Sequence, residues 1–492
     1  MKYASPESVG ISSADVLNFY KALDEYHLST HSVIMARGNT IFSECYYAPF
    51  HKDFLHRMYS VSKSFVSIAI GFCEQDGLLS LDDPIEKYFA EYVSGKPERY
   101  RQNTTIREFL RMETSVEAEK SWFNTGCTDR VAVYFENVPD KNPNTLFRYD
   151  SSGSFLLGVV VEKVTGKPFL KYLQEKVLDA IGFSKNAYSI QAPGGHSFGD
   201  SGVMCTAMDL MLFARFVLNS GTWEGKRYLN EAYIQNATRM AVCNNNFGFA
   251  AHGGFGYGWQ FWGMYKGCFG MFGMGNQIAL CDPAHDFIFV INSDNQGNPY
   301  NYEQIFTALY ANIINKLSDV TVLPEALQAQ KALQDYTNSR KLFCLYEASE
   351  SPFAECINGK RFLCDPNPMG IKWFRLSFAG DTGCFQYENA QGEKAFSFGF
   401  GHKVFSKIPQ YDYPDLIATV PEKGNCYDAA FSADWPEEKK LRIRVQIIDK
   451  YFGNLAIVFG FRDEDTVSVR RVKSAEAFLK EYSGYMNASA EI

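Results

Sequence analysis

The spacing of apolar and polar residues changes along the chain. Residues 1–320 combine several helical runs with a few strand-like runs. The apolar run at residues 65–72 is followed by Gly77, and this pattern predicts a buried helix with its C-terminal stop. Helices are also expected over residues 154–175 and after Thr206, which is a suitable N-cap. The first part is therefore predicted to form a domain of mixed helices and strands.

Strands are predicted near both ends of this first part. The stretch HSVIMARGNTIFSECYY is typical of two strands joined at the turn dipeptide Gly38-Asn39. Two further apolar strands, QIALCDP and DFIFVINS, lie around a second turn. A helix at about residues 301–316 follows, and a linker helix entered at Pro324 is expected over residues 321–342.

Beyond about residue 340 the apolar positions recur at every second residue. LRIRVQI at residues 441–447 alternates strictly between apolar and charged side chains, and FRLSF at residues 374–378 also alternates. Turn clusters such as AGDTG and NAQGE separate these runs. The pattern predicts a separate antiparallel β domain over residues 343–492, either a barrel or a sandwich.

Composition and charge narrow the range of functions. The 492 residues are too many for one ordinary core, so two or three domains are expected. Hydrophobic residues make up 46% and charged residues 21%, as in soluble globular proteins. The formal net charge of −8 is modest and argues against nucleic acid or an anionic membrane as the main partner. No run approaches ~20 apolar residues, so no membrane-spanning helix is expected.

The start of the chain and its cysteines bear on location and on metals. MKYASPESVG lacks the charged and apolar regions of a signal peptide, so a cytoplasmic protein is expected. The twelve cysteines include no CxxC pair and no metal-type spacing. They are expected to be reduced thiols, which fits the same compartment.

The stretch YSVSKSF at residues 59–65 carries the strongest candidate chemistry. Ser60 and Lys63 are three residues apart at a predicted helix start, so they share a face and the lysine can reach the hydroxyl. The positive end of the helix dipole would favour an alkoxide there. Neutralising a lysine at pH 7 costs roughly 4.6 kcal/mol, so a dry pocket must supply most of the shift. Taken alone, the pair fits equally well a helix cap and a lysine that extends to solvent.

Other motifs accompany this pair in a fixed order. They are YASPESVGIS, HRMYSVSKSF, LSLDDPIEKYF, TTIREFLRM, FRYDSSGSFLLG and SGVMCTAMDLMLFARF. Together they resemble the serine β-lactamase/DD-peptidase superfamily, in which S-x-x-K is the nucleophile motif. The resemblance is greatest to the class C-like branch with esterases, D-aminopeptidases and 6-aminohexanoate-dimer hydrolases. It implies an α+β catalytic domain over residues 1–320, with a β-lactamase/transpeptidase-like antiparallel sheet flanked by helices.

The resemblance implies roles for the first two motifs. Ser60 would be the acylated nucleophile and Lys63 its base partner. The family's second motif, Tyr-x-Asn, falls on Tyr149-Asp150-Ser151, so Tyr149 would relay the serine proton to the leaving group. Which of Lys63 and Tyr149 is the base in each step stays open. Ser151 replaces the usual asparagine and would contact the substrate or Lys63 through its hydroxyl.

The third family motif is a cation, then one residue, then a glycine on an edge strand. We place it at Gly273-Met274-Gly275. The Asn276 N–H would then complete the oxyanion hole with that of Ser60, and Gly275 would let the substrate approach the backbone. Gly273 supplies no cation for a substrate carboxylate. Esters or amides without that carboxylate are therefore the expected substrates.

Aromatic residues precede this motif. FGYGWQFWG at residues 255–263 contains Tyr257, Trp259 and Trp262. They are candidate walls of a cleft for an apolar acyl group, and the alternative is that they form strand core.

These observations predict a serine hydrolase that acts on a small ester or amide, including D-amino-acid or cyclic-peptide substrates. The expected partner is a small molecule, with no metal or organic cofactor. One alternative is a true β-lactamase or D-Ala-D-Ala carboxypeptidase, and another is a non-catalytic ligand-binding or sensor protein on the same fold. The β domain would shape the cleft or mediate dimerisation, and the oligomeric state, including a homodimer, stays open.

Overall fold

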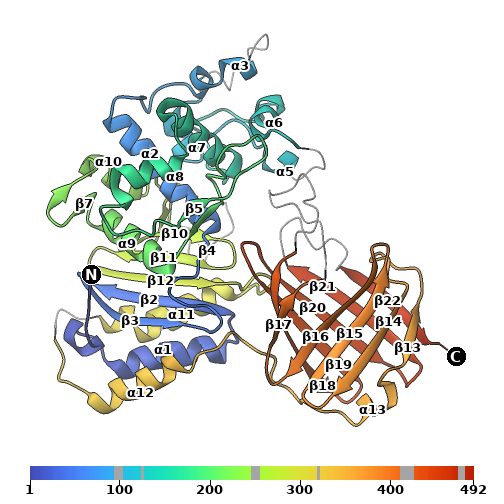
Figure 1. Cartoon of the computed structure of the whole chain (residues 1–492). Helices are drawn as coiled ribbons and strands as arrows, with labels where there is room; N and C mark the ends of the chain where they lie inside the picture. Colours follow the sequence, from blue (N-terminus) through green and yellow to red (C-terminus); the bar gives the residue numbers. More distant parts are fainter. Residues whose placement is uncertain are drawn as a thin grey trace. The chain divides into compact units, whose positions relative to one another are not determined.

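The computed structural model describes most of the chain, namely residues 1–93, 103–122, 127–244, 255–317, 322–409, 426–474 and 483–491. The chain forms two compact units, Met1–Leu342 and Phe343–Ile492. In Figure 1 the first unit runs from blue to yellow and the second from orange to red.

A seven-stranded sheet forms the centre of the first unit. Neighbouring strands are antiparallel, except that the short edge strand β1 runs parallel to β3. In spatial order the strands are β1 (Lys2–Tyr3), β3 (Thr40–Tyr46), β2 (Thr30–Arg37), β12 (Phe287–Ser293), β11 (Gln277–Asp282), β10 (Phe269–Gly273) and β9 (Trp262–Gly263). The predicted antiparallel sheet of the catalytic part is therefore confirmed.

Helices cover both faces of this sheet. On one face, α1 (Ser13–Glu25) and α11 (Asn301–Asn312) pack with the strands in a single apolar core (Figure 1). On the other face, α9 (Ala207–Leu218) lies against β2, β11 and β12. Every residue of β12 is buried. Because both faces are covered, residues 287–291 of β12 form an uninterrupted apolar run rather than alternating with polar residues.

The helix expected after Ser60 is α2 (Ser62–Gln75), and nearly all of its side chains are buried. It ends before Gly77, which adopts a φ of +72°. Helix α7 (Ser151–Thr165) packs against α2. Thr206 caps α9 as expected, because its side chain accepts a hydrogen bond from the Asp209 N–H.

Shorter elements complete the first unit. The helices are α3 (Ala90–Val93), α4 (Ile106–Leu110), α5 (Glu119–Trp122), α6 (Arg130–Glu136), α8 (Phe169–Leu173) and α10 (Glu231–Thr238). One small sheet has the order β4 (His56–Arg57), β6 (Val203–Cys205), β5 (Tyr188–Ser189), and a hairpin joins β7 (Thr222–Trp223) to β8 (Lys226–Arg227). No helix among the described residues is long and apolar enough to cross a membrane.

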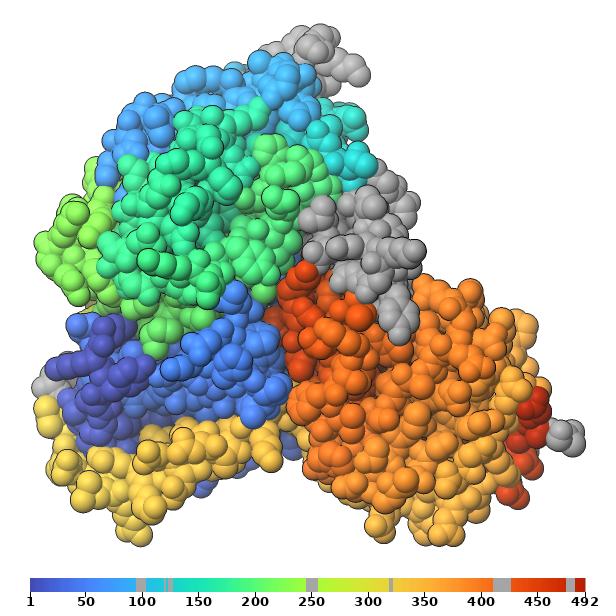
Figure 2. Space-filling view, viewed as in Figure 1, coloured from blue at the N-terminus to red at the C-terminus, as the bar shows by residue number. Residues whose placement is uncertain are grey.

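The expected linker helix is α12 (Leu327–Asn338), and it belongs to the first unit. Leu333 packs into the core that α1 and the sheet share, and the Tyr336 hydroxyl donates to the Asp24 carboxylate of α1. In Figure 2 the yellow segment that contains α12 lies against the blue N-terminal segment. The boundary expected at residues 320–321 falls outside the described residues.

The second unit is an antiparallel barrel of nine strands, which the parallel pairing of β16 with β18 closes. A tenth strand, β17, is not counted in the barrel and pairs with β18 beyond the end of β16. The strands are β13 (Arg361–Cys364), β14 (Trp373–Ala379), β15 (Thr382–Asn389), β16 (Gly392–Phe400), β17 (Val404–Lys407), β18 (Asp428–Glu437), β19 (Lys440–Ile448), β20 (Phe452–Phe461), β21 (Thr466–Ser474) and β22 (Gly484–Ala490). A short helix, α13 (Phe353–Ile357), precedes them. The expected β fold is confirmed as a barrel.

Candidate active site

Ser60 lies in a short 3-10 turn, Tyr59–Val61, that leads directly into α2. The turn is closed by a hydrogen bond of 3.1 Å from the Val61 N–H to the Met58 carbonyl. Tyr59 adopts a φ of +46°, which is an unfavourable backbone conformation for a residue with a bulky side chain. Within the described residues, the N–H of Ser60 donates no hydrogen bond. It can therefore serve a ligand.

The Lys63 amine lies at the centre of the polar contacts around Ser60. Its side chain is 1% exposed. The Nζ atom is 3.0 Å from Ser60 Oγ, 3.2 Å from Ser151 Oγ and 2.9 Å from the Asp200 carbonyl oxygen. The alternative of a lysine that extends to solvent is therefore wrong, because the amine is buried and surrounded by oxygen atoms.

These three neighbours fit both protonation states of the amine. An ammonium has three N–H groups and donates to all three oxygens. A neutral amine donates through two N–H groups and accepts through its lone pair. The Asp200 carbonyl can only accept, whereas the Ser60 hydroxyl can also donate. The neutral amine can thus donate to Asp200 and Ser151 and accept the Ser60 proton, which is the arrangement a general base requires.

The segment that carries Asp200 is tied to the Ser60 turn by several contacts. The buried Arg57 guanidinium donates to the Ser201 carbonyl (3.0 Å) and to the Ser201 hydroxyl (3.2 Å). The Met58 N–H donates to the Val203 carbonyl at 2.9 Å. Sequence analysis assigned no role to this segment, although its SGVMCTA stretch belongs to one of the motifs in the family resemblance.

The second motif stands at the start of α7. The Asp150 carboxylate caps this helix by accepting from the N–H groups of Ser152 (2.9 Å) and Gly153 (3.0 Å). This cap fixes Tyr149 just before the helix and Ser151 at its first position. The Tyr149 ring centroid is 5.0 Å from Lys63 Nζ. The structure therefore brings the predicted residues of the first two motifs together.

An aromatic cluster surrounds Tyr149. Trp262 stacks on the Tyr149 ring at 5.3 Å, and Tyr257 meets it edge-on at 6.5 Å. Tyr257 thus lies beside the site, as expected, although it is buried. Trp262, from the same aromatic stretch, was also a candidate wall of the cleft.

Trp259 does not join this cluster. Its ring packs against Tyr233 of α10 at 5.1 Å and beneath the Arg107 guanidinium at 5.7 Å. The chain turns between Tyr257 and Trp262, with a positive φ of 65° at Gln260. This turn points Trp259 away from Tyr149, so the expectation of a common aromatic wall is corrected at this position.

The third motif forms the hairpin between β10 and β11. A Cβ atom added at Gly273 would lie 2.3 Å from the Met58 carbonyl oxygen. Glycine is therefore required at residue 273, because β10 approaches the segment that leads into Ser60. Gly275 and Asn276 lie in the hairpin loop with φ values of +79° and +73°.

The hairpin geometry argues against the predicted oxyanion donor. The Asn276 N–H donates to the Gly273 carbonyl at 3.2 Å, so the turn itself uses this group. By contrast, the N–H of Met274 donates no hydrogen bond within the described part of the chain. We placed the glycine of the third motif at Gly275. The structure instead puts the close backbone approach at Gly273, two residues earlier.

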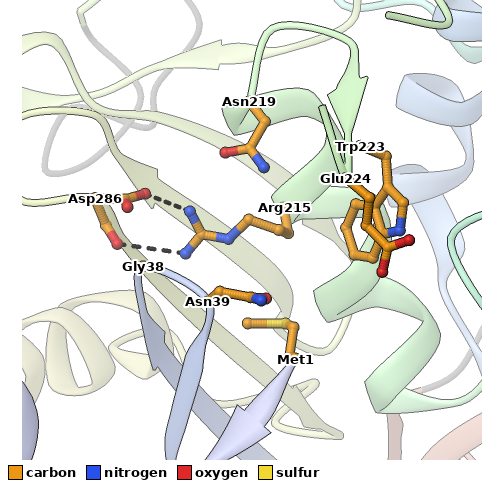
Figure 3. A pocket seen from close by; sticks show the side chains of 8 residues that line it. All are labelled: Met1, Gly38, Asn39, Arg215, Asn219, Trp223, Glu224 and Asp286. Carbon is orange, nitrogen blue, oxygen red and sulfur yellow. Dashed lines mark hydrogen bonds and ion pairs between the residues drawn. The ribbon is translucent and has the colours of Figure 1, made fainter. Parts of the chain in front are cut away.

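A separate pocket of about 320 Å³ lies elsewhere in the first unit. Figure 3 shows its lining residues, which include Arg215 of α9 and Asp286. The Arg215 guanidinium donates to the carboxylate and to the carbonyl of Asp286. None of the predicted site residues lines this pocket, and we do not assign the substrate to it.

The sequence matches the family described as Beta-lactamase over residues 18–311. A 6-aminohexanoate-dimer hydrolase of Paenarthrobacter ureafaciens is 24% identical over 286 residues, which cover 53% of this chain and 71% of that protein.

Two solved structures are similar in fold. A Bacillus anthracis protein described as a candidate 6-aminohexanoate-dimer hydrolase has a TM-score of 0.54 and 19% identity, and covers 62% of this chain and 83% of its own. A family VIII carboxylesterase has a TM-score of 0.50 and 15% identity, and covers 63% and 99%. At these identities, the structural similarity establishes a shared fold.

Proposed function

The chain belongs to the β-lactamase family of serine hydrolases, and we propose that it hydrolyses small esters or amides that lack a free carboxylate, through an acyl-enzyme on Ser60. One observation carries the proposal. The buried Lys63 amine is 3.0 Å from Ser60 Oγ and has two other hydrogen-bond partners for its remaining N–H groups. Amides of D-amino acids and cyclic peptides fall within this substrate class.

Acylation begins with attack of Ser60 Oγ on the substrate carbonyl carbon. The serine proton passes to Lys63 Nζ, and the carbonyl oxygen becomes an oxyanion. The bond to the leaving group then breaks, and that group takes a proton from the pair formed by Lys63 and Tyr149. Ammonium with phenolate and amine with phenol have the same net charge, so the pair shares a single proton in either state. Ser151 keeps the amine oriented during the transfer.

Deacylation repeats these steps with water as the nucleophile. A water molecule attacks the ester carbonyl of the acyl-enzyme and gives its proton to the same pair. The bond between the acyl carbon and Ser60 Oγ breaks, and the proton returns to Ser60. The acid product leaves, and Lys63 is again ready to accept a proton.

We assign the oxyanion to the N–H groups of Ser60 and Met274. Gly273 closely approaches Met58, two residues before Ser60, and this supports the assignment. Both N–H groups lack a hydrogen bond within the described residues. Preorganised donors of this kind are each worth about 10²–10³ in kcat in other hydrolases.

The proposal of a substrate without a free carboxylate rests on the residue that occupies the cation position. In the family pattern the cation stands two residues before the glycine. If Gly273 is that glycine, the cation position falls on Met271, which shares a face of β10 with it. Met271 is fully buried and apolar. We therefore move the cation position from Gly273 to Met271. The consequence for the substrate is unchanged, because neither residue carries a charge that could bind a substrate carboxylate.

Labelling by a fluorophosphonate, measured by intact mass, tests the proposal. The parent protein should gain one phosphonyl group and hydrolyse a short-chain p-nitrophenyl ester. Ser60→Ala should lose both activities, whereas Ser67→Ala, a buried serine two turns along α2, should keep both. Labelling of Ser60→Ala at another serine would contradict the assignment.

The same preparation discriminates the alternatives. Nitrocefin turnover with kcat/KM near ~10⁴ M⁻¹s⁻¹ or above would favour a true β-lactamase. A folded parent protein that is neither labelled nor active would favour a binding or sensor protein.

A further inference from the structure

The peptide group between Gly273 and Met274 is held from its carbonyl side. The Gly273 oxygen accepts hydrogen bonds from the Asn276 N–H at 3.2 Å and from the Tyr302 hydroxyl at 3.3 Å. A trans peptide is planar, so its C=O and N–H point in opposite directions. The two donors on the Gly273 oxygen therefore fix the direction of the Met274 N–H.

Tyr302 reaches this carbonyl from the first turn of α11. Its ring packs against Phe272 at 5.9 Å, next to the glycine in β10. Burial, followed by the neighbouring Tyr149, raises the pKa of Tyr302 well above its usual value. The hydroxyl is therefore protonated at neutral pH and acts as a donor to the carbonyl.

Side-chain amides from the first turn of α11, from the segment before it and from β11 also hold the hairpin loop. The Asn276 side chain accepts from Asn295 at 3.1 Å, and its amide donates to the Asn301 side chain at 3.0 Å. The Gln277 side chain donates to the Met274 carbonyl at 2.9 Å and to the Ser293 carbonyl at 2.6 Å. Each neutral amide has a partner, so the loop has a defined conformation before any substrate arrives.

We propose that Tyr302 is a positioning residue for the oxyanion hole, acting on the Met274 N–H through the Gly273 carbonyl. A hydrogen bond to the oxygen of a peptide withdraws electron density and makes its N–H a stronger donor, by roughly 10–30% per bond. It also prevents rotation of the peptide away from the oxyanion. This inference rests on the proposed function.

Tyr302→Phe tests the inference, because it removes the hydroxyl and keeps the ring that packs on Phe272. We expect kcat for a p-nitrophenyl ester to fall about threefold to tenfold, as for loss of one hydrogen bond, with KM within about twofold. Counting active sites with a fluorophosphonate removes any effect of unfolded protein. Tyr310→Phe, on the same helix, is the matched control and should leave kcat unchanged.

An alkylboronic acid separates this role from a structural one. Ser60 Oγ adds to boron, its proton passes to Lys63, and the tetrahedral boronate places an oxygen in the oxyanion hole. Its inhibition constant should rise by the same factor as kcat falls in Tyr302→Phe, while the pH profile of kcat keeps its shape. The inference would be overturned if Tyr302→Phe changed neither the inhibition constant nor kcat, or changed KM alone. The proposed function would still stand in that case, provided that Ser60→Ala is inactive. If Ser60→Ala kept its label, both would fall together.

Discussion

The two halves of the candidate site are built from different kinds of group. In the Ser60 half, two hydroxyls and a phenol ring surround the buried amine of Lys63. The hairpin half, residues 273–277, presents peptide groups held by neutral side-chain amides. Burial and proton exchange govern the first half, whereas peptide dipoles do not titrate. Substitutions in the first half should therefore change the pH dependence, and those in the second should change only the rate.

The two halves are also supported by different parts of the first unit. The Ser60 turn is tied to the segment that carries Asp200, mainly through Arg57. The hairpin is tied to the first turn of α11, through Tyr302 and Asn301. Each support can be removed without touching the other, so the comparison can be tested one half at a time.

Loss of the Lys63 amine should have the largest effect. Lys63→Met replaces the buried lysine with an apolar side chain of similar length, so the space stays filled and Ser60 loses its proton acceptor. We expect kcat to fall by ~10²–10⁴, the usual share of general acid–base catalysis, and at least as far as in Tyr149→Phe. Stopped-flow assays of p-nitrophenyl ester hydrolysis at several pH values measure this. A variant with more than a tenth of the parent kcat would show that another group takes the proton.

The Ser60 half was predictable from sequence because its geometry is local. Residues three apart on a helix share a face whatever surrounds them, so the Lys63 side chain could be expected to reach Ser60. The apolar run of α2 and the cap at Thr206 are similarly local signals. What the sequence did not reveal was the third partner of Lys63, the Asp200 carbonyl, because a backbone oxygen contributed by a distant loop has no residue signature.

The hairpin half was harder because its register depends on tertiary contacts. Two glycines lie two residues apart, and only the approach of β10 to Met58 shows that Gly273 is the crowded one. The Asn276 assignment failed for this reason. Trp259 was misjudged because a turn at Gln260 interrupts the strand pattern. In the second unit, alternation predicted the strands, but a barrel and a sandwich share that alternation.

A smaller effect is expected from a carboxylate on the substrate, and it tests what the hairpin half recognises. A charge-assisted contact is worth roughly 1.5–3 kcal/mol, or about tenfold to 150-fold, and the buried Met271 cannot supply it. We compare a short-chain p-nitrophenyl ester with a matched ester that bears a free carboxylate. The neutral ester should have the higher kcat/KM.

Two cations close in sequence to site residues are candidates to replace the missing one. Arg148 is paired with Asp140, and Lys266 is exposed in the turn before β10. Arg148→Gln and Lys266→Gln should therefore leave the preference unchanged. A clear preference of the parent enzyme for the carboxylate ester, abolished by either variant, would contradict the proposal that the substrate lacks a free carboxylate.

The smallest effect is expected from the support of the Ser60 half. Arg57 is fully buried and holds both the carbonyl and the hydroxyl of Ser201, next to the Asp200 carbonyl that contacts Lys63. Arg57→Lys keeps the charge but cannot reproduce the two contacts of the planar guanidinium. We expect kcat to fall about threefold to tenfold, as for loss of one or two hydrogen bonds. Because Lys63 is then less well oriented, the shape of the pH profile should change, unlike in Tyr302→Phe.

A double-substitution cycle shows whether Arg57 acts through Ser201. Ser201→Ala removes the hydroxyl contact and should lower kcat by about twofold, whereas the combined variant should be no slower than Arg57→Lys alone. Such non-additivity follows because Arg57→Lys already breaks the contact that Ser201→Ala removes. Additive losses would mean that Arg57 acts by another route, for example through the Tyr59 ring, 4.2 Å from its guanidinium carbon. In that case Arg57 would support the Ser60 half through the Tyr59–Val61 turn itself and not through the segment that carries Asp200. The two halves would then differ less in how they are supported.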